Sequence, residues 1–321
     1  MNAGGSPDII VVGSAHMDVI ARAARLPGAG ESLLGDSYAM HPGGKAGNQA
    51  IAAAQQGART AIIARVGSDG FGDELRRALS KKLVDVTFLL RDTIARTGVS
   101  PVFMANSGEY ASIIVPGASQ RLTPELVSAA MSALGNCKVL MVQLEIDLAT
   151  SAAAISVGKG GAALVMLNAS PVSSLASALK WSFWSDVDLL IVNRDEASML
   201  SGIDLGVHSH APRAATELRR RFGVREAVIT LGARGAAISS GSEEVEISGH
   251  VVPVIDTLGA GDAFAGALAA SLVRGDDLTS ATEFATVVGA IAVQREGAYD
   301  ASPTLAEARS VAEAVHRQSA R

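Results

Sequence analysis

Short apolar runs alternate with helix-like segments along most of this chain, and that alternation restricts the possible folds more than any other feature. The runs occupy residues 9–12, 61–66, 139–142, 163–167, 189–192 and 227–230. The helix-like segments occupy residues 47–56, 73–82, 124–134, 148–157 and 211–222. Because the runs are apolar at consecutive positions, they are typical of strands that are buried on both faces. The pattern predicts an α/β fold with a mostly parallel central sheet covered by helices on both faces, with ligands at the carboxyl ends of the strands.

Two stretches, about 15–41 and 97–117, lack this rhythm because they contain alternating, hairpin-like segments with no helix between them. Strands inserted in this way predict a small β-sheet that projects from the main one and closes over a ligand as a lid. An edge extension of the main sheet is the alternative. The carboxyl-terminal third is helical, at 259–274, 279–294 and 304–317. Since no repeat or linker divides the chain, we predict a single domain over residues 1–321.

Composition excludes several classes of function. Apolar residues make up 48% of the 321 residues and charged residues 18%, which is typical of a folded globular protein. The formal net charge of −5 argues against nucleic-acid binding, which needs a basic surface. No apolar stretch reaches the roughly 18–20 residues of a membrane span, and the amino terminus has no basic signal-peptide region. The one cysteine cannot form an internal disulfide, which fits a reducing compartment. The lack of a membrane span and of a signal peptide predicts a soluble, cytoplasmic protein.

Residues 256–264, with the sequence DTLGAGDAF, form the strongest local motif. Gly259 and Gly261 permit a sharp turn, and the good helix former that follows begins near Ala263. A glycine turn that opens a helix directs backbone amides and the positive end of the helix dipole at one point, which predicts an anion site. Asp262 lies in that turn, where we expect a low pKa. The alternative is that Asp262 only caps the helix and the glycines only form a tight turn.

Residues 42–50, with the sequence PGGKAGNQA, form the second motif. The glycines allow a ligand to approach the backbone, Lys45 supplies a mobile positive charge, and the Asn48 amide can both donate to and accept from hydroxyl groups. A purely structural helix start is the alternative. Polar residues that follow predicted strands, Asp18, Glu145 and residues 193–196, are expected at the ligand edge of the sheet, although each could be a solvated strand end. Glu196 could hold a metal ion through water.

Several other motifs are missing from the sequence. There is no G-x-x-x-x-G-K-[ST] phosphate loop, no H-E-x-x-H and no pair of C-x-x-C motifs. We therefore expect neither a Walker-type nucleotide site nor one of the usual zinc sites.

Taken together, these segments resemble the ribokinase, or phosphofructokinase-B, family of carbohydrate kinases from about Asp8 to Pro303. GGKAGNQA at 43–50 and DTLGAGDAF at 256–264 are similar to the family's two signatures. GSAHMD at 13–18, PGAGES at 27–32, QLE at 143–145, NRDE at 193–196 and TLGARG at 230–235 occur in the family's order. The resemblance implies a three-layer core with a β lid that forms a homodimer contact. It also implies phosphorylation of a sugar hydroxyl by ATP, ribose or a related pentose being the expected acceptor.

The resemblance also implies a role for individual residues. Asp262 would be the base, and the amides of Gly259, Ala260 and Gly261 would form the anion hole. The sugar would be held by Asp18, Gly43, Gly44, Lys45, Asn48 and Glu145, with His16 beside them. Asn193, Thr230, Gly232 and Gly235 would line the nucleotide site, and Glu196 would position hydrated Mg²⁺. A monovalent cation such as K⁺ would lie near Asp256, Leu258, Ala292, Arg295 and Gly297.

The sequence departs from the ribokinase pattern at three places. His16 replaces an asparagine that touches the sugar, and histidine is larger and can titrate. The first signature reads Lys-Ala-Gly-Asn instead of Lys-Gly-Ala-Asn. Ala301 replaces the serine that closes the cation site, although Ser302 is adjacent. A nucleoside kinase of the same family and a catalytically silent sugar or nucleotide sensor are the alternative functions. The low aromatic content favours a free sugar over a nucleoside, and Asp262 argues against a sensor.

Overall fold

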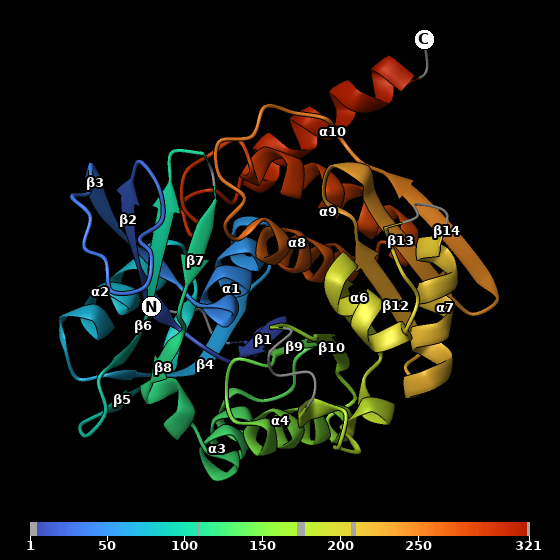
Figure 1. The fold of residues 1–321 in the computed structure, drawn as a ribbon. Helices are drawn as coiled ribbons and strands as arrows, with labels where there is room; N and C mark the ends of the chain where they lie inside the picture. Colours follow the sequence, from blue (N-terminus) through green and yellow to red (C-terminus); the bar gives the residue numbers. More distant parts are fainter. Residues whose placement is uncertain (1–4, 108, 172–176, 207–209, 320–321) are drawn as a thin grey trace.

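A nine-stranded sheet forms the centre of the computed structural model, which describes residues 5–107, 109–171, 177–206 and 210–319 (Figure 1). The strand order is β14-β13-β12-β11-β10-β9-β1-β4-β5. The strands are β1 (Ile9–Val12), β4 (Thr60–Gly67), β5 (Asp85–Asp92), β9 (Val139–Gln143), β10 (Leu164–Asn168), β11 (Leu189–Asn193), β12 (Glu226–Thr230), β13 (Gly235–Ser240) and β14 (Glu243–Ser248). The seven strands from β12 to β5 in this spatial order pair in parallel with their neighbours. Strands β13 and β14 form an antiparallel edge next to β12.

Helices cover both faces of this sheet, because successive residues of a strand face opposite sides. In β1, Ile9 and Val11 pack in one apolar cluster, and Ile10 and Val12 pack in another. The first cluster includes α1 (Lys45–Gln55), α2 (Gly70–Lys81), α8 (Ala260–Arg274), α9 (Leu278–Ala292) and α10 (Leu305–Ser319). The second includes α3 (Pro124–Leu134), α4 (Leu148–Gly160), α6 (Arg194–Ser201) and α7 (Ala211–Phe222). The predicted three-layer α/β/α class is confirmed.

A second sheet of five strands contains the two segments without helices (Figure 1). Its strands are β2 (His16–Ala23), β3 (Ser37–Gly43), β6 (Thr97–Ala105), β7 (Tyr110–Ser112) and β8 (Val115–Gly117). The order is β3-β2-β6-β7, with β8 paired to β6. These strands pair with one another, so they form a separate small sheet and not an edge of the larger one.

The prediction missed several elements for identifiable reasons. Strand β13 reads GAAISS and β14 reads EEVEIS, and glycine, alanine and glutamate are depleted in strands. Strand β5 lies at the opposite edge of the sheet and mixes buried with exposed positions. Helix α6 has eight residues, which is shorter than the windows that reveal helical periodicity. The short 3-10 turns η1 (Ala118–Arg121), η2 (Phe183–Asp186) and η4 (Gly232–Arg234) were also not predicted.

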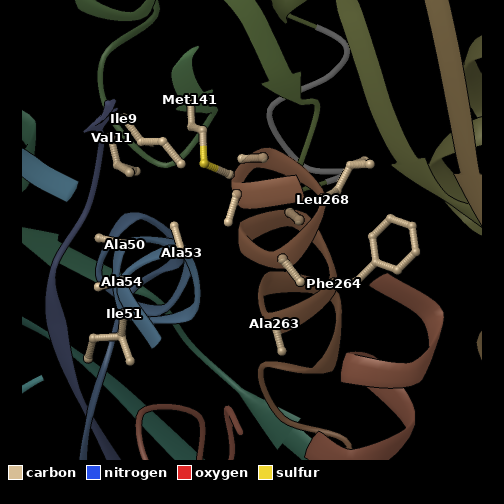
Figure 2. Close-up of a cluster of buried hydrophobic side chains, with 14 of the residues drawn as sticks. Ile9, Val11, Ala50, Ile51, Ala53, Ala54, Met141, Ala263, Phe264 and Leu268 are labelled. Atoms are coloured by element: carbon tan, nitrogen blue, oxygen red, sulfur yellow. The ribbon is translucent and has the colours of Figure 1, made fainter. Parts of the chain in front are cut away.

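Helices α1 and α8 carry the two signature motifs and pack side by side through small residues (Figure 2). A Cβ atom at Gly266 would lie 2.5 Å from the Cβ of Ala52 and 2.6 Å from the backbone oxygen of Gln49. Only glycine fits at this contact, because those distances are far below van der Waals separation. The close packing brings the first turn of α1 next to the first turn of α8, although about 214 residues separate them in sequence.

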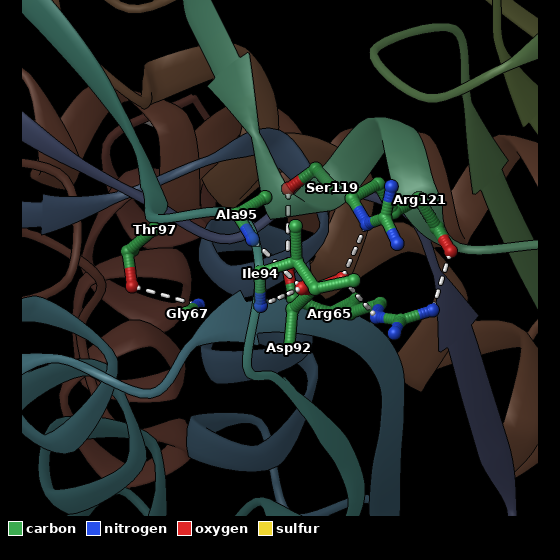
Figure 3. Close-up of polar contacts among 8 residues, drawn as sticks. All are labelled: Arg65, Gly67, Asp92, Ile94, Ala95, Thr97, Ser119 and Arg121. Carbon is green, nitrogen blue, oxygen red and sulfur yellow. Dashed lines mark hydrogen bonds and ion pairs between the residues drawn. The ribbon is translucent and has the colours of Figure 1, made fainter.

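Both connections between the core and the residues 97–117 of the small sheet are held by the buried carboxylate of Asp92 (Figure 3). Asp92 accepts hydrogen bonds from the amides of Ile94 and Ala95, at 2.7 and 2.8 Å. It also forms ion pairs with Arg65 at 2.9 Å and Arg121 at 2.7 Å. Burial opposes the charge, but the two amides and Arg121 hold the pKa of Asp92 at about 2.

We expect Asp92→Asn to lower the free energy of unfolding by about 3 kcal/mol, because removing one partner of a buried ion pair leaves the others unpaired. An unfolded aspartate titrates near pH 4, so the contribution of Asp92 is complete above about pH 4 and is lost as the pH falls towards 2. Denaturant titrations at neutral pH and at about pH 3 measure both effects, and the difference between variant and wild type should shrink at the lower pH.

Asp73→Asn is the control for this prediction, since Asp73 forms an exposed pair with Arg91 on neighbouring elements. Exposed pairs contribute about 1 kcal/mol or less. Equal unfolding midpoints for Asp92→Asn and the wild type would contradict a structural role for Asp92.

Candidate active site

A cleft of about 770 Å³ lies between the small sheet and the carboxyl ends of the parallel strands. The small sheet contributes His16, Asp18, Ile20, Ser100, Val102, Met104, Ser112 and Ile114. The opposite wall comes from strand ends and the turns that follow them, including Glu145 after β9, Asn168 of β10, Asn193 of β11 and Thr230 of β12. The cleft therefore lies at the sheet edge where the strand pattern predicted ligands.

Asp262 lies at the bottom of this cleft, in the first turn of α8, and only 6% of it is exposed. Its two carboxylate oxygens accept hydrogen bonds from different side chains of α1. The Asn48 amide nitrogen is 2.8 Å from Oδ2, and the Gln49 amide nitrogen is 2.9 Å from Oδ1. The two signature motifs thus meet through these bonds, and the carboxylate is oriented by its neighbours before any ligand binds.

The prediction of a low pKa for Asp262 is wrong. Burial raises the pKa of this carboxyl above its ordinary value, and the charge of Lys45 and the hydrogen bonds from Asn48 and Gln49 oppose the shift only in part. The sequence indicated the favourable end of a helix dipole, but it could not show that the side chain would be shielded from water. A carboxylate with a raised pKa is a better proton acceptor than an ordinary aspartate.

A second polar cluster lies at the junction of the small sheet and α1. Glu145 accepts the backbone amide of Lys45 at 3.0 Å and the hydroxyl of Ser14. His16 contacts Asp18, with Nε2 3.2 Å from Oδ1. Burial alone would lower the pKa of His16, but the hydrogen bond to Asp18 and the charges of Glu145 and Asp18 raise it above its ordinary value. Asp18, Lys45 and Glu145 all line the cleft.

The side chain of Asn48 has two polar atoms, and the described residues provide a partner for only one of them. Its amide nitrogen donates to the aspartate, whereas its buried Oδ1 has no hydrogen-bond partner among the described residues. Buried polar atoms are almost always paired, and Asn48 lines the cleft, so its Oδ1 is an acceptor that the described protein residues leave for a ligand.

The other end of the cleft is lined by Asn193, Glu196, Thr230 and Gly232. Asn193 and Glu196 form a capping box at the start of α6, in which each side chain accepts the backbone amide of the other residue, at 2.9 and 2.8 Å. Burial raises the pKa of Glu196, although the Asn193 amide and Ser170 oppose the shift. Glu196 therefore has a clear structural role in addition to the one that the resemblance implies.

Six of the expected site residues do not line the cleft: Gly43, Gly235, Ala260, Ala292, Arg295 and Gly297. The amide of Ala260 donates to the Thr257 carbonyl at 3.3 Å. Gly235 has a φ of 97° and lies against the backbone of β14, where a side chain would collide with the Ile247 carbonyl. The structure thus explains Gly235 by strand packing.

The loop at 295–302 meets the second signature at Asp256, which itself lines the cleft. The carboxylate of Asp256 accepts the amide of Leu258 at 2.9 Å and that of Gly297 at 3.1 Å. The Ala292 carbonyl accepts the Arg295 amide at 3.1 Å, and the Arg295 guanidinium reaches Glu307 at 3.3 Å. Among the described residues, no group of three or more His, Cys, Asp or Glu side chains could hold a metal ion by itself.

Tyr299, which the sequence analysis did not identify, explains the altered order of the first signature. Its buried hydroxyl donates to the Gly43 carbonyl at 3.1 Å, and it occupies the space that a side chain at position 47 would need. Burial, together with the charges of Asp18 and Asp262, strongly raises its pKa, so the phenol stays protonated as a donor. Glycine at position 47 and tyrosine at position 299 are thus compatible as a pair.

Three amides behind Asp262, those of Gln49, Gln143 and Asn168, were also missed. They form one connected network with the aspartate. Two sequence signals pointed to this network: Gln49 and Gln143 lie inside the motifs GGKAGNQA and QLE, and Gln143 is the one polar residue of the otherwise apolar strand β9.

A family model described as "pfkB family carbohydrate kinase" matches residues 6–305. The chain belongs to the pfkB family of carbohydrate kinases. A deoxyribokinase of Salmonella typhi is 30% identical over 298 residues, which are 93% of this chain and 96% of that protein. The ribokinase of Mus musculus is 32% identical over 299 residues, which are 92% of this chain and 91% of that protein.

The fold matches solved structures of the same family. The Arabidopsis thaliana ribokinase complexed with ribose and ATP has a TM-score of 0.84, with 24% identity over 96% of this chain and 99% of that one. This chain is therefore an ATP-dependent sugar kinase, and the sensor considered above is excluded as its main function. No helix among the described residues is long and apolar enough to span a bilayer.

Proposed function

We propose that this sugar kinase transfers the γ-phosphate of ATP to a hydroxyl group of ribose or a closely related pentose, with Asp262 as the base. The observation that carries the proposal is that Asp262, in the first turn of α8 beside the glycine turn, lines the same cleft as Asp18, Lys45 and Glu145. The two curated relatives reported above, which match most of this chain's length, are a deoxyribokinase and a ribokinase.

In the proposed reaction, a sugar hydroxyl oxygen attacks the γ-phosphorus while the bond from that phosphorus to the ADP oxygen breaks. The hydroxyl proton passes to the Asp262 carboxylate, whose raised pKa suits it to accept a proton. Asn48 and Gln49 orient the carboxylate, and the Gly259 and Gly261 backbone at the positive end of α8 faces the transferring group. Phosphoryl transfer depends mainly on such positioning and charge neutralisation.

The nucleotide would lie at the other end of the cleft, against Asn193, Thr230 and Gly232. Glu196 would hold hydrated Mg²⁺ through water, since protein carboxylates supply only part of the coordination and phosphates and water supply the rest. Glu196 fits this role because its side chain is a carboxylate and it lines the cleft. Mg²⁺ would neutralise charge on the phosphates as it develops.

The residues around Asp256 carry the types of oxygen atoms that bind a monovalent cation. The loops at 256–258 and 292–297 offer carbonyl oxygens beside a buried carboxylate, and the hydroxyl of Ser302 is buried without a hydrogen-bond partner among the described residues. We propose that K⁺ binds there. Gly235 and Ala260 receive no ligand role in this proposal, because the structure accounts for both through backbone packing.

The choice between ribose and its 2-deoxy analogue should depend on His16, whose imidazole is bound to Asp18. We expect His16→Asn to raise the ratio of kcat/KM for ribose over 2-deoxyribose about tenfold, because an amide offers a hydroxyl both a donor and an acceptor. Initial rates with both sugars measure the ratio. His41→Asn is the control, since His41 lies opposite Asp18 on β3 and does not line the cleft. An unchanged ratio in His16→Asn would remove His16 from sugar selection.

A coupled assay of ADP release across pentoses, hexoses and nucleosides tests the proposed function. Ribose or 2-deoxyribose should give the highest kcat/KM of the panel, and Mg²⁺ should be required. A preference for a nucleoside would instead support the nucleoside kinase considered above. Rates in potassium and in a bulky organic cation test the cation site.

We further propose that residues 1–321 form one catalytic domain in which the small sheet closes over the sugar, and that the protein acts in the cytoplasm.

The small sheet exposes Tyr38 and Met40 of β3, Phe103 of β6, and Ile113 just after β7. We propose that this face forms a homodimer contact, because contiguous exposed apolar side chains are typical of interaction surfaces. Sedimentation analysis of the wild type and of a Met40→Lys variant tests the dimer.

A further inference from the structure

Gln49 makes direct contact with the carboxylate of Asp262 but lies outside the cleft. It is completely buried in the second turn of α1, and it does not belong to the cleft lining. Its amide nitrogen donates to Asp262 Oδ1 at 2.9 Å and to Asn168 Oδ1 at 3.1 Å, which uses both of its N–H groups. A substrate in the cleft therefore approaches Asp262 from one side, while Gln49 holds the Asp262 carboxylate from another side.

The direction of the Gln49 amide is set by a chain of hydrogen bonds that begins at the main chain. The Ile191 carbonyl can only accept, so the Asn168 amide nitrogen, 3.2 Å away, must face it. The other end of that side chain, Asn168 Oδ1, then needs a donor, which is the Gln49 nitrogen. Gln49 Oε1 consequently points the other way, where it accepts from the Gln143 amide nitrogen at 2.6 Å. With Gln49 reversed, its one amide oxygen would face both Asn168 Oδ1 and the Asp262 carboxylate, and its nitrogen would face the Gln143 nitrogen. Acceptors would then meet acceptors and a donor would meet a donor.

We propose that Gln49 is a positioning residue for proton transfer, which keeps Asp262 ionised and oriented, and that Gln143 and Asn168 set the direction of its amide. This inference rests on the proposed role of Asp262 as the base. Asn48 also donates to Asp262, but it lines the cleft and its Oδ1 has no hydrogen-bond partner among the described residues, so in this proposal it serves the substrate as well. Gln49 and Gln143 are not part of the cleft lining, so their amides serve the carboxylate whether or not a sugar is bound.

The surroundings of Asp262 have opposing effects on the protonation of its carboxyl group. Burial and the charge of Glu145 favour the protonated form, whereas Lys45, Asn48 and Gln49 favour the ionised form. Without the Gln49 donor, only Lys45 and Asn48 would counteract the effect of burial and of Glu145 on the pKa of Asp262. The carboxylate would then be protonated up to a higher pH, and a protonated Asp262 cannot accept the proton of the sugar hydroxyl.

Gln49→Met tests the inference, because methionine has a similar volume and no donor. At neutral pH we expect kcat to fall about ten- to a hundredfold, with KM for sugar and ATP changed by less than about threefold. The acid limb of the kcat–pH profile should move up by about one to two pH units, the shift expected for one hydrogen bond to a charged group. Raising the pH should restore much of the lost kcat, which a merely structural defect would not allow.

Gln56→Met is the matched control. Gln56 is a buried amide at the end of the same helix, and it donates to the Pro303 carbonyl at 2.7 Å, away from the cleft. Its loss should lower stability without moving the acid limb. Gln143→Met should move the limb in the same direction as Gln49→Met but by less, and it decides the matter if Gln49→Met fails to fold.

The outcomes separate this inference from the function on which it rests. An unchanged acid limb in Gln49→Met, or in Gln143→Met where the first variant does not fold, would overturn the positioning role and leave Asp262 as the base. A full kcat in Asp262→Asn would overturn the base itself.

Discussion

Asp262→Asn is expected to lower kcat by about 10²–10⁴-fold, the range for general acid–base contributions, while KM for the sugar changes much less. The reason is that asparagine keeps the shape of the side chain but cannot accept a proton from the attacking hydroxyl. The asparagine oxygen can still accept from one of the two amides that hold the wild-type carboxylate, those of Asn48 and Gln49. Steady-state rates of ADP release over a range of sugar concentrations separate kcat from KM.

Asp276→Asn serves as the control for this experiment. Asp276 lies just beyond the other end of α8, accepts from Ser271, and is not part of the cleft. Its kcat should match the wild type. Near-normal turnover in Asp262→Asn would show that the base lies elsewhere.

Gly261→Ala is expected to reduce kcat about a hundredfold without loss of stability. Beyond its chain neighbours and its own helix backbone, a Cβ atom at Gly261 would meet none of the described residues within 4 Å, and Gly261 lines the cleft. The added methyl group would therefore extend towards the space that we propose for the transferring phosphoryl group. Misplacement of reacting groups by about 1 Å can cost about a hundredfold in rate. Within a helix, alanine is otherwise more favourable than glycine by about 0.5–1 kcal/mol.

Gly259→Ala provides the contrast, because Gly259 lies in the same turn as Gly261 but is constrained by packing. Gly259 has a φ of 74°, and a Cβ atom there would lie 2.5 Å from the Cβ of Ala298. We expect this variant to lose stability, measured by thermal or denaturant unfolding. A loss of stability in Gly261→Ala that parallels its loss of activity would favour a purely structural turn.

Sequence patterns were sufficient for the parallel core and for the location of the site. Consecutive apolar residues in strands such as 9–12 and 189–192 reflect burial on both faces, a property that each segment carries locally. Glycine turns at helix starts are local too, so the two signatures could be recognised separately. Low-propensity edge strands could not be predicted, because β13 and β14 form only where a neighbouring strand offers hydrogen bonds.

The chemistry of the site, in contrast, depended on contacts between distant segments. The sequence placed Asp262 at a helix start and so suggested a low pKa, but tight packing of α1 against α8 at Gly266 buries the carboxylate and raises its pKa. The same packing brings Gln49 to Asp262, and β9 brings Gln143 to Gln49. Local sequence therefore determined which groups the chain possesses and which elements carry them. Only the tertiary structure decided how ionisable those groups are, because desolvation and hydrogen bonding depend on neighbours that are more than 90 residues away along the chain.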